Sequence, residues 1–75
     1  DAEVVFNKLA DGSQVSILTV DGLLVRQIPS DQIIAQKLSW DGRNASGQMV
    51  AGGIYLFVIT APDGNHRAGK IAVIK

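Results

Sequence analysis

His66 is the only histidine of the chain, and it lies in a polar stretch, residues 63–67 (DGNHR). Nucleophilic catalysis would need this imidazole beside a Ser or Cys side chain that it activates. The chain has no cysteine. Its serines, which lack the Gly-x-Ser-x-Gly context of a nucleophile elbow, are Ser13, Ser16, Ser30, Ser39 and Ser46. The sequence therefore predicts no catalytic residue and no enzyme, and we interpret His66 as a solvated turn residue.

A second polar stretch, residues 41–47 (DGRNASG), carries side-chain oxygens at Asp41, Asn44 and Ser46. Their spacing differs from that of an EF-hand loop, and no Glu follows to close such a loop by bidentate ligation. Asp and Asn side chains also accept hydrogen bonds from nearby backbone amides in turns, where Gly42 and Gly47 would supply unusual dihedral angles. Without a Cys/His cluster as well, the sequence predicts turn chemistry here and no metal site.

The charge balance favours neither nucleic acid nor an anionic membrane as a partner. Lys plus Arg and Asp plus Glu both number 7, and the chain lacks the aromatic platform that single-stranded nucleic acid requires. Gly52-Gly53 is not followed by the Lys-Ser or Lys-Thr of a phosphate loop, so no nucleotide cofactor is expected. No apolar run approaches the roughly 18 residues that span a bilayer. We therefore expect protein partners, no cofactor and no membrane insertion.

The elements that position these residues are predicted to be short β-strands. Asp-Gly pairs at 11–12, 21–22, 41–42 and 63–64 each flank a segment rich in Val, Ile, Leu or aromatic residues, which is typical of strands joined by tight turns. No long helical period lies between them, so an all-β, antiparallel sandwich of about seven strands is expected. The expected strands are residues 3–9, 14–18, 23–28, 36–40, 53–60 and 67–74, with a further short strand near 48–50.

Residues 30–35 (SDQIIA) are predicted to form one helical turn or an irregular crossover between the sheets. Either Ser30 or Asp31 would provide the N-cap of such a turn. Pro29, which has no backbone donor, is expected to end the preceding strand.

The segment 54–59 (IYLFVI) is apolar on both faces of the strand that it is expected to form. Strands of this kind are typical of places where both faces are buried. One face carries Tyr55, Phe57 and Ile59, and the other carries Ile54, Leu56 and Val58. One of the two would lie on the core, and the other would be covered either by loops of this domain or by another domain or copy of the chain.

Residues 40–57 (WDGRNASGQMVAGGIYLF) resemble the W-D-G-R-(N/D)-x-x-G-x-x-V-A-x-G-x-Y signature of FlgD-like immunoglobulin-type domains. Residues 22–28 (GLLVRQI) and 70–75 (KIAVIK) are similar to two further strands of that family. The chain departs from it at Gly52-Gly53, where many members have Ser-Gly, and lacks the leading Pro-Asn-Pro that often precedes the domain. The signature positions are Trp40, Asp41, Gly42, Arg43, Gly47, Val50, Gly53 and Tyr55.

This resemblance implies an immunoglobulin or fibronectin III-like sandwich formed by residues 1–75 as a single domain. Trp40 would anchor the core, residues 41–47 would reverse the chain, and Val50 would cover the core. Tyr55 would point inward with Phe57 and Ile59, which makes the opposite face of that strand, Ile54, Leu56 and Val58, the candidate interaction face. Because the domain type is similar to the C-terminal sorting domains of type IX secretion cargo, the chain is expected to end a larger exported protein. Its expected location is extracellular or at the bacterial cell surface.

The leading functional hypothesis is a non-catalytic accessory domain that acts in secretion, surface attachment or docking. Its partners would be the preceding domain of the parent chain, the secretion machinery, or another copy of itself. One alternative is a self-assembling subunit of a flagellar hook-cap-like or fibre assembly. Another is a carbohydrate-binding module, for which the candidate aromatics are Phe6, Trp40, Tyr55 and Phe57.

Overall fold

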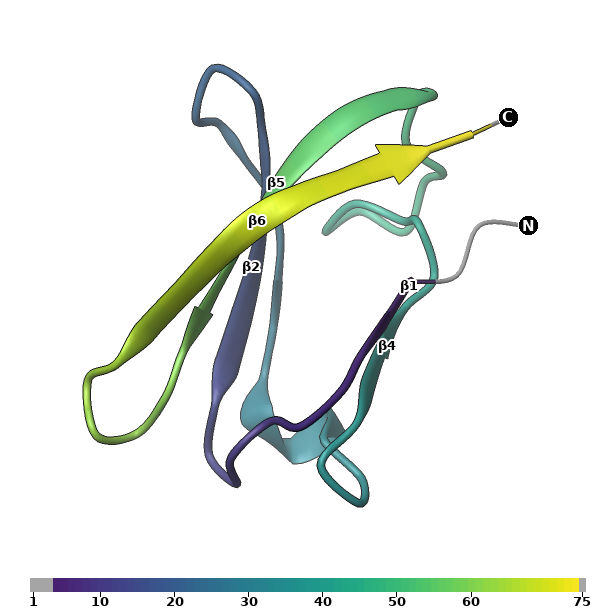
Figure 1. The fold of residues 1–75 in the computed structure, drawn as a ribbon. Helices are drawn as coiled ribbons and strands as arrows, with labels where there is room; N and C mark the ends of the chain where they lie inside the picture. The colour runs from purple at the N-terminus through teal and green to yellow at the C-terminus, as the bar shows by residue number, and fades with distance from the viewer. Residues whose placement is uncertain (1–3, 75) are drawn as a thin grey trace.

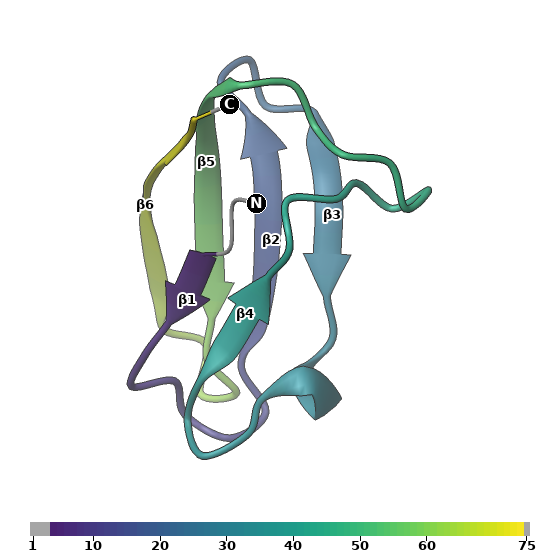
Figure 2. The same cartoon turned by 90° about the vertical axis from the view of Figure 1, so that its right-hand side faces the viewer.

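The structure, a computed structural model, describes residues 4–74. These residues form six strands and one turn of 3-10 helix. A two-stranded antiparallel sheet, β1–β4, packs against a four-stranded antiparallel sheet of order β3–β2–β5–β6. In Figure 1 the small sheet stands on one side of the large sheet, and in Figure 2 it crosses in front of β2 and β5. The elements are β1 Val4–Phe6, β2 Gln14–Thr19, β3 Leu24–Ile28, η1 Ser30–Gln32, β4 Leu38–Trp40, β5 Gly53–Thr60 and β6 His66–Val73.

The architecture confirms the predicted all-β sandwich. The strands β2, β3, β5 and β6 end within one residue of the expected bounds, whereas three other expected strands are absent or clearly shorter. Residues 48–50 form no strand and contribute only an isolated bridge between Arg43 and Met49. The strand expected over residues 3–9 ends at Phe6, two residues before Lys8, whose φ is 59°. The strand expected over 36–40 begins only at Leu38, because Ala35 and Gln36 have φ values of 53° and 64°. A residue with left-handed backbone dihedral angles cannot continue a β-ladder, and the hydrophobic pattern of a sequence does not predict where such a residue lies.

Two hairpins of the large sheet use the Asp-Gly turns that the sequence predicts. The loops 20–22 and 62–64 each place Gly at the third position, where Gly22 and Gly64 both have φ of 93°. Backbone hydrogen bonds close both loops, from Thr19 N to Leu23 O at 2.8 Å and from Ala61 N to Asn65 O at 2.8 Å. A three-residue hairpin loop requires a left-handed residue before the returning strand, and glycine adopts this conformation at the lowest cost.

The core lies between the two sheets and follows the alternation of the strands. Val15 and Ile17 of β2 are completely buried, while Ile71 and Val73 of β6 are 5% and 4% exposed. Trp40 at the end of β4 is the largest side chain in this core and is 1% exposed. The other buried apolar residues are Phe6, Leu9, Ile28, Leu38, Val50 and Ile59.

The short helical turn was expected, but the predicted N-cap is wrong. Pro29, rather than Ser30 or Asp31, occupies the cap position, with φ −70° and ψ 157°, and no side chain caps the turn. The turn is held by backbone bonds alone, from Gln32 N to Pro29 O and from Ile33 N to Ser30 O, both at 3.1 Å. Pro29 follows β3 directly, because its fixed φ suits an extended cap and it lacks the donor that a continuing strand needs.

Candidate interaction surface

The signature loop, residues 41–52, begins with hydrogen bonds that involve Trp40, Asp41 and Arg43. The indole Nε1 of Trp40 donates to Arg43 O at 2.9 Å, which gives this buried ring a partner for its one donor. The Asp41 Oδ1 atom accepts from Arg43 N at 3.1 Å and from Arg26 Nη1 at 3.1 Å. Gly42 adopts φ 79° between them. Asp41 therefore holds a turn and joins it to β3 through an ion pair.

The second half of the loop is a turn held by Asn44. Its Oδ1 atom accepts hydrogen bonds from Ser46 N and Gln48 N, both at 3.0 Å. The guanidinium of Arg43 donates to Gly47 O at 2.8 Å, and Gly47 has φ 84°. The oxygens of Asp41 and Asn44 thus accept backbone amides of the loop itself. Within residues 4–74, no three His, Cys, Asp or Glu side chains come together to hold a metal ion.

The loop returns to the core before β5 begins. Val50 is 8% exposed, and its amide donates to Gly42 O at 2.9 Å. The ring of Tyr55 packs edge to face on Trp40 at 6.0 Å, and its hydroxyl donates to Ala51 O at 2.7 Å. Gly53 opens β5 with φ 151°. The signature residues consequently pack on and hydrogen-bond one another, and the polar atoms described above have their partners within the loop or on Arg26.

The outer face of the large sheet, which points away from β1 and β4, is built by alternate residues of its four strands. Strand register places Leu24, Leu18, Leu56 and Lys70 in one cross-strand row. A neighbouring row consists of Gln27, Ser16, Val58 and Ala68. Ile54 pairs with Ala72 at the end nearest the signature loop. We call this set of residues the outer face.

No described element covers the outer face, as Figure 1 shows. Leu24 and Ile54 are 60% and 50% exposed, whereas Leu18, Leu56 and Val58 are half-buried by one another. An open hollow of about 400 Å³ lies beside Leu56 and Lys70. The sequence left two possible covers for this side of β5, loops of this domain or another protein surface. Within residues 4–74, no loop of the domain covers it.

The sequence pattern predicts that Ile54, Leu56 and Val58 share one face of β5, but it does not predict that Leu18 and Leu24 lie on the same face. Leu18 directly follows Ile17, so it lies out of phase with the buried positions of β2. That phase break is the signal that could have found it. Leu24 requires tertiary information, because a bulge between Ile17 and Leu18 shifts the register of β3 and brings Leu24 opposite Leu18.

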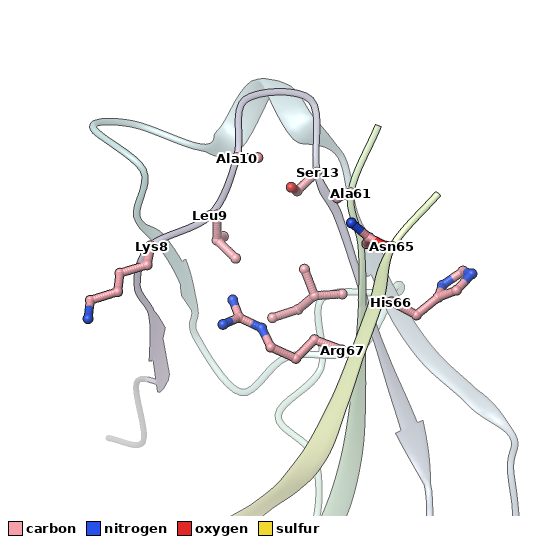
Figure 3. Close-up of a pocket in the computed structure, with 9 residues that line it drawn as sticks. Lys8, Leu9, Ala10, Ser13, Ala61, Asn65, His66 and Arg67 are labelled. Carbon is pink, nitrogen blue, oxygen red and sulfur yellow. The ribbon is translucent and has the colours of Figure 1, made fainter. Parts of the chain in front are cut away.

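The hollow shown in Figure 3, about 250 Å³, lies at the end of the sandwich near His66. Arg67 extends from β6 toward Leu9, while the ring of His66 points away from the hollow (Figure 3). The Nδ1 atom of His66 lies 3.2 Å from Thr60 Oγ1, its cross-strand neighbour on the exposed side of the sheet. Among residues 4–74, no carboxylate hydrogen-bonds this ring, and Thr60 is its side-chain partner.

The fold and these contacts define a class of protein, an immunoglobulin-like β-sandwich with a turn-rich loop between its two sheets. The sequence profile described as the FlgD Ig-like domain matches residues 1–65, and the chain belongs to this family. A search of curated proteins gave no match. No helix in residues 4–74 is long and apolar enough to cross a membrane.

Among solved structures, the chain is similar to PorZ of Porphyromonas gingivalis, described as an essential bacterial surface component of the type IX secretion system. The sequences are 28% identical over 95% of this chain, and the TM-score is 0.75. The matched region makes up 9% of the PorZ chain. The likeness therefore covers a larger part of the chain than the residues that the family profile matches.

Proposed function

We propose that residues 1–75 form one non-catalytic domain at the C-terminal end of a larger exported bacterial protein. In this proposal the domain acts at the cell surface or outside the cell, in secretion, surface attachment or docking to the preceding domain. The uncovered apolar outer face carries the proposal, because an apolar patch of this kind on a small domain marks a protein contact.

The comparisons also support a role in protein contacts. The family is one of immunoglobulin-like domains, and the matched part of PorZ is a small fraction of a chain described as a secretion component. Such a domain would act by presenting a surface to another protein, since the polar atoms of its signature loop are already engaged. We infer a partner that is itself protein, either the preceding domain or a part of the secretion machinery.

A carbohydrate-binding role has less support from the aromatic side chains. Trp40 and Phe6 are 1% and 7% exposed. Tyr55 and Phe57 lie on the core side of β5, where Phe57 packs edge to face on Phe6 at 5.1 Å. None of these rings forms the exposed platform on which a sugar ring would stack.

An export assay tests the proposed function. The 75-residue chain is fused to the C-terminus of a periplasmic reporter enzyme, and reporter activity is measured in the medium and on the surface of a bacterium with a type IX system. We expect the fusion to be exported and the unfused reporter to be retained. Equal retention of both proteins would overturn the secretion role.

Two single variants then locate the surface that acts. Val58→Lys and Leu56→Lys place a charge on the outer face without removing a core residue, so we expect folding with reduced export or attachment. Ile34→Lys is the matched control, because Ile34 is 77% exposed and lies outside the outer face. If all three variants behaved like the unmodified fusion, the outer face would not be the contact surface.

A further inference from the structure

The two edges of the large sheet differ in how far they are protected. The β3 edge has five residues and a bulge beside Ile17, and the signature loop reaches it. Ala45 N donates to Val25 O at 3.1 Å, and Arg26 pairs with Asp41 at 3.1 Å. Bulges and covering loops are the usual means by which proteins prevent an edge from pairing with another strand.

The β6 edge has none of these protections. It runs for eight residues without a register shift, and no second strand of residues 4–74 pairs with it. Figure 1 shows β6 along the front of the molecule with its free side open. A long regular edge of this kind is a template for strand addition.

The hairpin register tells which backbone groups point out of this edge. Ala61 and Asn65 form a hydrogen-bonded pair, because Ala61 N donates to Asn65 O at 2.8 Å. Hydrogen-bonded and non-bonded pairs alternate along an antiparallel ladder. The outward N–H and C=O groups therefore belong to four exposed residues, His66, Ala68, Lys70 and Ala72.

Charge selects the kind of segment that this edge accepts. Residues 64–75 contain Arg67, Lys70 and Lys75 but no Asp or Glu, and the adjacent β5 has no charged residue. Lys70 is exposed in the middle of β6, and it is the one Lys, Arg, Asp or Glu among the outer-face positions of the described strands. A partner strand with a carboxylate beside Lys70 would gain a cross-strand ion pair.

The same lysine disfavours pairing of β6 with a second copy of itself. In an antiparallel pairing that joins the outward residues of both copies, the two Lys70 side chains fall directly opposite or diagonal to one another. Like charges at these positions are destabilising. A second copy is therefore a poorer occupant than an acidic segment.

We propose that the free edge of β6 binds an extended protein segment that adds to the sheet as a fifth strand and places a carboxylate beside Lys70. This inference rests on the proposed role as a protein-interaction domain and names the chemistry of its partner. Backbone hydrogen bonds would supply most of the contact, and Lys70 the selectivity. On the outer face, the side chains of the added strand would lie beside Ala68, Lys70 and Ala72 of β6.

Peptide titration with amide exchange tests the inference on the 75-residue chain. The probes are two blocked eight-residue peptides of alternating Thr and Val, one with a central Glu and the other with a central Lys. We expect the amides of Ala68, Lys70 and Ala72 to exchange rapidly in the free chain and to become protected by the Glu peptide, with β3 unchanged. An exposed ion pair predicts that the Lys peptide binds roughly threefold to tenfold more weakly.

Two variants and a matched control sharpen the result. Lys70→Glu is expected to reverse the preference between the peptides, whereas Lys37→Glu, the same charge change on the other side of the sandwich, should leave it unchanged. Ala72→Pro removes an outward donor without breaking a bond to β5, so we expect a folded chain that binds neither peptide.

Protection by neither peptide, or a preference that survives Lys70→Glu, would overturn the proposal. Protection of the same amides by raising the protein concentration alone would identify a second copy as the occupant and would also overturn it. The export assay separates the two proposals. If export proceeds with Lys70→Glu and no peptide binds, the edge proposal fails while the secretion role stands; peptide binding without export gives the opposite conclusion.

Discussion

Asp41 and Asn44 are the residues of the sequence that most resemble metal ligands, but in the structure their side chains accept hydrogen bonds from backbone amides. Asp41 Oδ1 and Asn44 Oδ1 each accept an amide hydrogen from the residue two positions further along the loop. An oxygen occupied in this way offers less to a cation. The ion pair of Asp41 with Arg26 is half exposed on the Asp41 side, so we expect it to orient the loop more than to stabilise the fold.

Replacing Asn44 tests this assignment. Asn44→Ala leaves two backbone amides without their acceptor, and we expect a loss of about 1 kcal/mol in the free energy of unfolding. Asn44→Asp retains an acceptor oxygen and should recover most of that loss. Urea denaturation of both variants is the measurement. Equal destabilisation by Ala and Asp would show that the turn does not depend on the side-chain acceptor.

Trp40 links the small sheet, the loop and Tyr55, and its loss should be severe. Trp40→Ala removes the largest buried side chain, for which a cost of about 3–5 kcal/mol is typical. Since a domain of this kind has only about 5–15 kcal/mol of total stability, we expect a largely destabilised chain. Thermal and urea unfolding measure it, with Leu23→Ala, at a position 65% exposed, as the control. A loss below that of the control would contradict the anchoring role.

At the scale of elements, β5 and β6 fit together through a glycine. A Cβ atom built on Gly69 would lie 2.6 Å from two ring atoms of Phe57, its partner across the ladder. The ring occupies the space that a side chain would fill, and it also packs on Phe6. The absence of a side chain at position 69 therefore lets Phe57 lie across β6 and close the core.

Gly69→Ala is expected to destabilise the domain by about 1–3 kcal/mol, because the ring must move out of a packed position. Phe57→Leu shortens that side chain and should relieve the clash. A double-mutant cycle read by urea unfolding measures the coupling. If the two losses simply add, the packing of Phe57 on Gly69 does not limit substitution there.

At the scale of the whole molecule, the small sheet covers one face of the large sheet, and the outer face remains uncovered. The chain has no disulfide to strengthen it, since it contains no cysteine. A chain of this length buries only about 60% of the surface that its unfolded form exposes. A partner that covered the outer face, as proposed above, would bury further apolar surface and add to the stability of the domain.

The isolated chain is expected to be monomeric, because Lys70 opposes self-pairing of the open β6 edge. Lys70→Ala removes this repulsion and should produce concentration-dependent dimers. Sedimentation velocity from micromolar to millimolar concentration distinguishes the two chains. Dimers of the unmodified chain, or strict monomers of both, would show that Lys70 does not control association.

The sequence alone predicted much of this fold. Its Asp-Gly pairs placed the turns, because a hairpin loop needs a left-handed residue and glycine supplies it. Its alternating segments gave the core residues of β2 and β6, such as Val15, Ile17 and Ile71, which are 0–5% exposed. Residues 40–57 identified the family. These features are local or periodic, so they can be read without coordinates.

The tertiary structure decided what local patterns do not contain. The ends of β1 and β4 depend on the positive φ values of Lys8, Ala35 and Gln36, which side-chain patterns do not encode. The outer face arises from register across four strands, and the bulge at Val25 in β3 brings Leu24 opposite Leu18. The sequence of residues 40–57 is thus enough to identify the family. The uncovered outer face and the free β6 edge, in contrast, depend on how strands distant in sequence pair in the folded chain.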